Sequence, residues 1–260
     1  MIILIAESKT MAACDGSVTP DQYALHRPAL DTQAGSIMES LRGMNAGELA
    51  TAVKISLPMA RRLVRMIYDF PDKRLGGEAI EAFTGVVFRA FGYRSLDDNA
   101  RRRACGHVRI VSSLYGWLRP DDIVKPYRFD FTTALAPGGR NFAAYWREYV
   151  TGCLLDELEA CGTTEVLNLL PGDAARCIDW KRVGAAATVW KADFREAVAG
   201  GTFRTPNSNR LKTLRGELLR QIVCDGISSA GQLMTAVGDN YIGEGSPQPT
   251  PRGMYWRWAV

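Results

Sequence analysis

The chain has 260 residues, of which 47% are hydrophobic and 23% charged. These fractions are typical of soluble globular domains, and they exclude a chain that is disordered over most of its length. The formal net charge of +4 is a mild basic excess that by itself indicates no class of partner. No run of 18 apolar residues occurs, so we expect no membrane-spanning helix.

The first predicted element is a buried strand over residues 1–6, which are continuously apolar and mostly branched. Glu7 and Lys9 follow at its carboxyl end, where ligand sites of α/β folds tend to lie. Residues 12–36 show no periodicity and are predicted as a loop. Helices are predicted over 36–52 and 59–68, joined by a tight connection, and over 78–91 with Gly85 inside.

In the second half, aspartates at 97 and 98 are predicted to cap a helix that runs through residues 101–103. Asn141 is predicted to cap a long amphipathic helix. A basic helix over 209–224 is predicted to end at Gly226. Strands are predicted at 107–115, 165–170, 186–190 and 202–204, with an edge strand at 254–258. Because neither repeats nor a linker interrupt these elements, the sequence predicts one α/β domain over residues 1–260.

Generic catalytic and cofactor motifs are absent from the sequence. It has no GxxxxGK[ST] or GxGxxG loop, no GxSxG elbow and no HExxH pair. The six cysteines lack zinc spacing and there are only two histidines, so we expect neither a metal site nor a cofactor. No signal peptide is predicted, because the apolar start meets Glu7 at once. We therefore expect a cytoplasmic protein with free thiols.

The strongest cluster of basic residues lies between residues 107 and 128. A predicted strand leads into a glycine turn and then into the corners Arg119-Pro120 and Tyr127-Arg128. Proline restricts the backbone beside each basic side chain, which lowers the entropy lost when an anion binds. Guanidinium groups bind phosphate through paired hydrogen bonds. The sequence leaves open the alternative that these arginines pair with neighbouring aspartates in a turn.

Eight segments, in this order along the chain, resemble the motifs of one protein family. They are LIAESKT at 4–10, ISLPMA at 55–60, FTGVVF at 83–88, HVRIVSSLYGWLRP at 107–120, PYR at 126–128, YW at 145–146, VLNL at 166–169 and KTLRG at 212–216. The motif at 107–120 is long and specific. The chain thus resembles the YaaA family of bacterial peroxide-stress proteins, as a divergent member.

The resemblance implies a single domain with a mixed β-sheet flanked by helices, a helix-hairpin-helix-like element and a positively charged cleft. It also implies binding of duplex or distorted DNA and a role in limiting free iron and oxidative DNA damage during peroxide stress. By position, the residues expected to bind nucleic acid or another anion are Lys9, Arg109, Tyr115, Arg119, Tyr127, Arg128, Asn168, Lys212 and Arg215.

The chain departs from the family motifs at several positions around this expected cleft. Glu7 stands where the family has proline, and Val86 and Phe88 replace an acidic residue and a tyrosine. Residues 170–174 (LPGDA) replace the family's A-S-x-E-Y, although Asp173 keeps a carboxylate. The basic residues of the motifs are thus retained, while the residues around them at 7, 86, 88 and 170–174 differ. This pattern suits a ligand that is still anionic but is contacted differently.

Two functions remain open from the sequence. The first is DNA binding in the peroxide stress response. The alternative is a divergent enzyme of a biosynthetic pathway, acting on a nucleoside, nucleotide or other small phosphorylated substrate. In that enzyme Lys9, desolvated beside arginines, would act as base or nucleophile, and Asp173 or Glu7 as general acid or base. Direct iron binding is a third possibility, which no ligand spacing supports.

Overall fold

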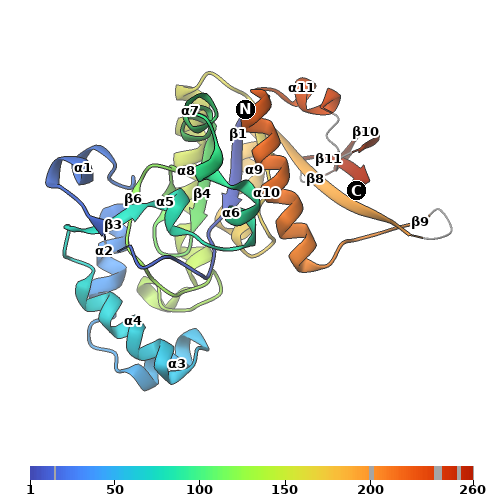
Figure 1. The fold of residues 1–260 in the computed structure, drawn as a ribbon. Coiled ribbons are helices and arrows are strands. Elements are labelled where there is room, and N and C mark those ends of the chain that lie inside the picture. Colours follow the sequence, from blue (N-terminus) through green and yellow to red (C-terminus); the bar gives the residue numbers. More distant parts are fainter. Residues whose placement is uncertain (15, 199–201, 237–241, 251–252, 260) are drawn as a thin grey trace.

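A mixed β-sheet forms the centre of the structure, a computed structural model that describes residues 1–14, 16–198, 202–236, 242–250 and 253–259 (Figure 1). The strands run in the order β10-β11-β8-β7-β1-β4-β5, and β9 pairs with β8. Their bounds are β1 (Ile2–Ala6), β4 (Val108–Ser112), β5 (Gly116–Leu118), β7 (Glu165–Asn168), β8 (Thr188–Val198), β9 (Thr202–Arg204), β10 (Ile242–Thr250) and β11 (Gly253–Ala259).

Five neighbouring strands of this sheet are parallel. β1 pairs in parallel with β4 on one side and with β7 on the other, and β8 and β11 continue the parallel run. β5, β9 and β10 are antiparallel to their neighbours. The apolar run at the start of the chain is fully buried in β1, as a strand covered on both faces requires. The carboxyl ends of β1, β4 and β7 therefore meet at one edge of the sheet.

Helices cover both faces of the sheet. α6 and α10 pack against each other, and Figure 1 shows them in front of β1, with α8 and α9 behind. The helix bounds are α1 (Pro20–Leu25), α2 (Asp31–Ser40), α3 (Ala46–Val53), α4 (Leu57–Asp69), α5 (Ala79–Ala82), α6 (Val86–Phe91), α7 (Asp98–His107), α8 (Phe142–Ala160), α9 (Trp180–Ala186), α10 (Ser208–Asp225) and α11 (Ala230–Thr235). Short 3₁₀ turns η1 (Tyr93–Ser95), η2 (Pro137–Gly139) and η3 (Ala174–Cys177) join them. None of the helices in the described residues is long and apolar enough to cross a membrane.

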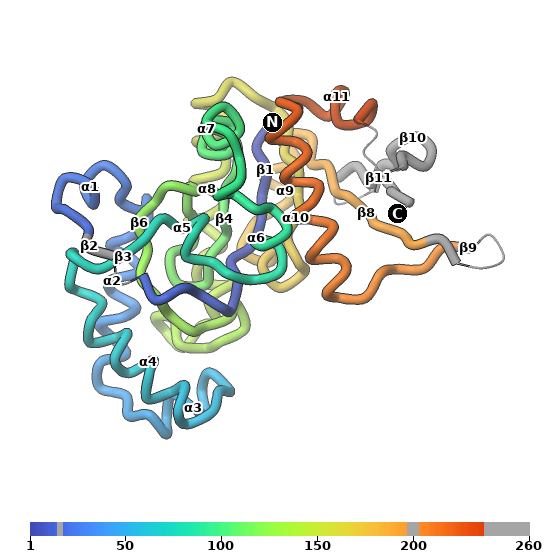
Figure 2. The backbone as a smooth tube through the Cα atoms, in the orientation of Figure 1, coloured from blue at the N-terminus to red at the C-terminus, as the bar shows by residue number. Residues whose placement is uncertain are grey.

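A small second sheet and a helical pair lie beside the central sheet. β2 (Gly16–Ser17), β3 (Leu75–Glu78) and β6 (Ile123–Val124) form the small antiparallel sheet. α3 and α4 pack together and project away from the rest of the chain (Figures 1 and 2). A three-residue turn joins them, with Lys54 in the left-handed region at φ 57°. That this pair is a helix-hairpin-helix element stays a prediction.

Several predicted elements are confirmed, because local sequence signals define them. Asn141 caps α8 by accepting a hydrogen bond from the backbone N–H of Ala144, and Asp97 caps α7 in the same way. α10 ends at Gly226, whose φ of 68° is easily reached only by glycine. The strand predicted at 254–258 is β11, but it lies between β8 and β10 and not at the edge.

Three other predictions are wrong. The region 12–36 is not a loop, because it contains α1 and the start of α2. The helix predicted over 36–52 is interrupted after Ser40, since Asn45 and Glu48 form a capping box that starts a new helix, α3. The helix predicted over 78–91 breaks around Gly85, whose backbone N–H donates to Ser8 Oγ at 3.0 Å. A Cβ at that glycine would lie 2.4 Å from the Ser8 Cβ, so the close contact requires glycine.

Candidate functional site

A cavity of about 610 Å³ lies at the carboxyl edge of the parallel strands. Its lining comes from the end of β1 and the following loop, from α6, from residues 130–131, from the segment after β7 and from α10. The strands position these loops directly, because Glu7 N donates to the Val111 carbonyl and Leu169 N to the Leu4 carbonyl. The volume falls within the range of about 300 to 1,000 Å³ that small-ligand sites occupy.

α10 supplies a basic wall to this cavity. Ser208, Lys212 and Arg215 line it, and their spacing of four and three residues places them on one helix face. Ser208 also opens this 18-residue helix, so the positive end of the helix dipole lies at the same wall. Together these groups favour an anion in the cavity.

Arg215 differs from the other basic residue of this wall, Lys212, in being partly buried. It is half-buried, and burial lowers its pKa against the opposing effect of the Asp173 carboxylate. Within the described part of the chain, no carboxylate oxygen lies within 4.0 Å of its guanidinium and no hydrogen bond is made by it. A half-buried guanidinium without such partners is suited to bind an anionic ligand.

Lys9 lines the cavity from the loop after β1. Its ammonium pairs with Asp130 Oδ2 at 3.2 Å, and its side chain is 56% exposed. Burial raises the pKa of Asp130, but hydrogen bonds from Thr132 and Lys9 outweigh burial, so that its pKa lies below the ordinary value. If Lys9 acted as a base, it was expected from the sequence to be desolvated beside arginines. Instead its side chain is largely exposed to solvent and pairs with a carboxylate.

Glu7 forms the floor of the cavity next to β4. Its Oε2 accepts hydrogen bonds from the Ser113 backbone N–H at 2.9 Å and from the Tyr127 hydroxyl. Tyr127 Oη also lies 2.7 Å from Ser112 Oγ. Burial raises the pKa of Glu7 to about 7, although the hydrogen bonds from Ser113, Tyr127 and Ser112 act in the opposite direction. Glu7 is therefore a carboxyl poised to titrate near neutral pH.

Asp173 also lines the cavity and caps η3, where it accepts from the backbone N–H of Ala174 at 3.0 Å. Four of the cavity-lining side chains are cationic and three are acidic, so positive charge is in slight excess. The cationic members are Lys9, Arg89, Lys212 and Arg215, and the acidic members are Glu7, Asp130 and Asp173.

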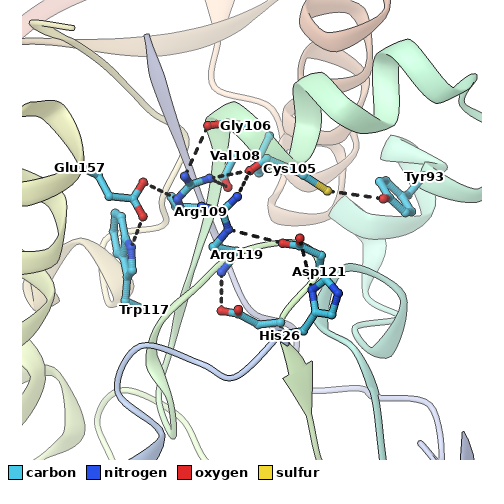
Figure 3. A network of polar contacts seen from close by, with 11 residues as sticks. His26, Tyr93, Cys105, Gly106, Val108, Arg109, Trp117, Arg119, Asp121 and Glu157 are labelled. Atoms are coloured by element: carbon cyan, nitrogen blue, oxygen red, sulfur yellow. Dashed lines mark hydrogen bonds and ion pairs between the residues drawn. The ribbon is translucent and has the colours of Figure 1, made fainter. Parts of the chain in front are cut away.

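Arg109 and Arg119 do not line the cavity, contrary to expectation. Figure 3 shows the polar contacts that hold them instead. Arg109 is 2% exposed and its Nε donates to Glu157 Oε2, while its other donors reach backbone carbonyls such as that of Cys105. Arg119 pairs with Asp121 at 3.5 Å, in a separate shallow groove beside α7. Arg109 thus joins α8 to the sheet, and Arg119 holds a turn, as the alternative interpretation had it.

The other expected residues lie outside the cavity lining as well. Tyr115 is buried and its hydroxyl accepts from the Lys125 backbone N–H at 3.0 Å. Asn168 is buried and its Oδ1 accepts from the Leu170 backbone N–H at 2.9 Å. Arg128 is half-buried, and Tyr127 is buried beneath Glu7. Of the expected residues, the structure therefore brings together Lys9, Asp173, Lys212 and Arg215.

Ser208, Arg89 and Asp130 line the cavity but were not expected from sequence. Asp130 is 121 residues from Lys9, and no local pattern signals such a pair. Ser208 had a usable signal, because it opens a predicted basic helix. Among the described residues, no group of three or more histidine, cysteine, aspartate and glutamate side chains is arranged to hold a metal ion.

Comparison with known proteins places the chain in a family. A family model described as peroxide stress protein YaaA matches residues 1–244. The chain belongs to the YaaA peroxide-stress family. It is 29% identical over 240 residues to a UPF0246 protein of Laribacter hongkongensis, which covers 90% of each chain. It is 28% identical over 246 residues to a UPF0246 protein of Magnetococcus marinus, covering 93% of each.

Proposed function

We propose that this YaaA-family protein binds DNA in the cytoplasm during peroxide stress, and that its cavity holds one phosphate-bearing nucleotide unit. Bound in this way, it limits free iron and oxidative damage to the DNA. The observation that carries the proposal is Arg215, a half-buried cation without a carboxylate partner in the described residues, placed on the same wall as Lys212. The cavity is too small for a duplex, so an unpaired nucleotide of distorted DNA is the unit that fits.

The α3–α4 pair supports contacts to the flanking DNA backbone. Lys54, Arg61, Arg62 and Arg65 are exposed, and none of them forms an ion pair with another described residue. Exposed arginines and lysines of this kind neutralise phosphates and release counterions. The arginine run of α7 gives less support. Arg103, for example, donates at 2.9 Å to the Cys224 carbonyl at the end of α10.

The test is fluorescence anisotropy with a labelled duplex and with a duplex carrying one unpaired nucleotide, each over a salt series. We expect tighter binding of the second DNA and a steep loss of affinity with salt. Arg215→Gln should weaken this binding by about tenfold or more, because a charged hydrogen bond is lost. Lys181→Ala, which changes an exposed lysine of α9 outside the cavity, is the control and should bind like the unmodified protein. Binding that is insensitive to salt, or equal in both variants, would contradict the proposal.

A second function is favoured by one observation, the carboxyl of Glu7 at the floor of a cavity of small-ligand size. We propose it as the alternative: an enzyme that acts on a nucleoside, nucleotide or other small phosphorylated substrate. Glu7 or Asp173 would exchange the proton, and Lys212 and Arg215 would hold the phosphate. Turnover of a phosphorylated compound that is lost in Glu7→Gln, in a protein that binds no DNA, would favour this alternative.

A further inference from the structure

The hydrogen bonds of Glu7 assign different tasks to its two oxygens. Oε2 accepts from the Ser113 backbone N–H and from the Tyr127 hydroxyl. Ser112 Oγ accepts from the backbone N–H of Leu114 and of Tyr115, so its own hydrogen is available to Tyr127 Oη. The hydrogens then run from Ser112 to Tyr127 and on to Oε2. With two donors aimed at Oε2, the proton of the neutral acid belongs on Oε1.

We propose that Glu7 contacts the ligand directly: protonated at Oε1, it donates a hydrogen bond to an anionic oxygen of the group held by Lys212 and Arg215, so that binding takes up one proton. This inference rests on the proposed function, which supplies the phosphate-bearing ligand. It adds a residue that distinguishes a tetrahedral oxyanion, whose oxygens accept hydrogen bonds, from a ligand that presents only hydrogen-bond donors. The only covalent change is the formation of an O–H bond at Oε1, when a proton from solution adds to the Glu7 carboxylate.

Electrostatics give the reason for the proton uptake. An ionised Glu7 would repel an anion in the same cavity, whereas the acid form offers it a donor. The ionisable groups around Glu7 are Tyr127 beneath it, Cys177 of η3, and the cavity-lining side chains of Lys9, Lys212, Arg215, Arg89, Asp130 and Asp173. Burial raises the pKa of both Tyr127 and Cys177, and Asp130 has a lowered pKa. Among groups with a shifted pKa that line the cavity, Glu7 is the one that titrates near neutrality.

Sulfate is the probe, because it is tetrahedral and stays a dianion throughout the pH range of the test. Isothermal titration calorimetry would measure its binding near pH 6 and near pH 8, in pairs of buffers with different ionisation enthalpies. If only the acid form binds, a site that titrates at about 7 loses about tenfold in affinity between these conditions. The buffer dependence should show uptake of almost one proton per sulfate near pH 8 and almost none near pH 6.

Glu7→Gln separates the contact from the charge. The amide keeps an oxygen for Ser113 and Tyr127 and offers an N–H where the acid offers an O–H. This variant should bind sulfate equally at both pH values, with the affinity that the unmodified protein has near pH 6. Asp122→Asn is the matched control. Asp122 also has a pKa raised by burial to about 7, but it lies outside the cavity and accepts from the Arg119 backbone N–H, so its variant should keep the tenfold dependence.

The outcomes separate this inference from the function on which it rests. No sulfate binding at either pH would overturn the anion site, and the proposed function with it. Binding that is lost in Arg215→Gln but shows the same affinity at both pH values would overturn the role of Glu7 alone. A pH dependence that survives in Glu7→Gln, or binding that survives in Arg215→Gln, would also overturn that role, because another group or another site would then be responsible.

Discussion

The raised pKa of Glu7 makes a prediction about the stability of the protein that requires no ligand. Its pKa is about 7 in the folded chain, against an ordinary value of 4.5. Between these two values the folded state binds a proton that the unfolded state has lost. The free energy of unfolding must therefore fall as pH rises from about 4.5 to about 7, and the contribution of Glu7 is constant outside that interval.

The change in the free energy of unfolding follows from the difference between the folded and ordinary pKa values of Glu7. One pKa unit corresponds to about 1.4 kcal/mol, so the ionisation of Glu7 lowers the free energy of unfolding by about 3 kcal/mol. Glu7→Gln cannot ionise and keeps the hydrogen-bond acceptor for Ser113 and Tyr127. Its stability should match that of the unmodified protein near pH 4.5 and exceed it by about 3 kcal/mol near pH 8.

Urea unfolding followed by circular dichroism, at several pH values between 4 and 9, measures this difference. Asp122 must be controlled, because burial raises its pKa to about 7 from 3.8 and gives a decline of the same sign. Asp122→Asn should remove the contribution of Asp122 to the pH dependence of stability and leave the contribution of Glu7. The double variant should show neither contribution. A Glu7→Gln protein whose stability falls with pH as steeply as that of the unmodified protein would refute the reasoning.

Three further predictions concern the buried Arg109–Glu157 pair, the α6–α10 contact and the hydroxyl that donates to Glu7. Glu157→Gln leaves the buried guanidinium of Arg109 without its charge partner, so it should lower the free energy of unfolding in urea by about 3 to 5 kcal/mol. Sulfate binding should be kept at pH values where the variant is folded. A loss of stability below about 1 kcal/mol would contradict this prediction. Gly216→Ala places a Cβ 2.3 Å from a carbonyl oxygen of α6, so it should cost about 1 to 3 kcal/mol and lower the melting temperature, and an unchanged melting temperature would refute the close contact. Tyr127→Phe removes a donor that stabilises ionised Glu7, so the midpoint of the pH-dependent sulfate binding should move to higher pH; a shift to lower pH would exclude this donor role.

Local signals predicted the elements that depend on neighbouring residues. The buried strand β1 and the helix capped by Asn141 each follow from a few consecutive residues. α1 was missed because six residues are too few to show a helical period. The split between α2 and α3 was missed although Asn45 and Glu48 have the capping-box spacing, because a longer apolar pattern spans the break.

The sequence predicted those cavity residues whose spacing along a single helix is visible without knowledge of the fold. Lys212 and Arg215 lie on one face of α10, and their spacing is visible in the sequence. Arg109 was misplaced because its partner Glu157 lies 48 residues further along the chain, and the sequence of the strand does not tell which of its side chains meet a helix. Asp130 lies in a loop whose path depends on packing, so its contact with Lys9 could not be foreseen.

Two contacts that fix α6 have a consequence for how ligand preference evolves in this fold. Gly85, the N-cap of α6, meets Ser8, and Gly216 of α10 meets the Val87 carbonyl and the Ala90 Cβ of the same helix, each without room for a methyl group. These elements therefore cannot approach more closely, and a larger residue at either glycine would push them apart at a cost in stability, about 1 to 3 kcal/mol for Gly216→Ala. Exchanging side chains on the existing frame is thus the less costly way to accommodate a new ligand. Val86 and Phe88, where the chain departs from the family motif, lie on α6 and line the cavity, which is where such exchanges are expected to accumulate.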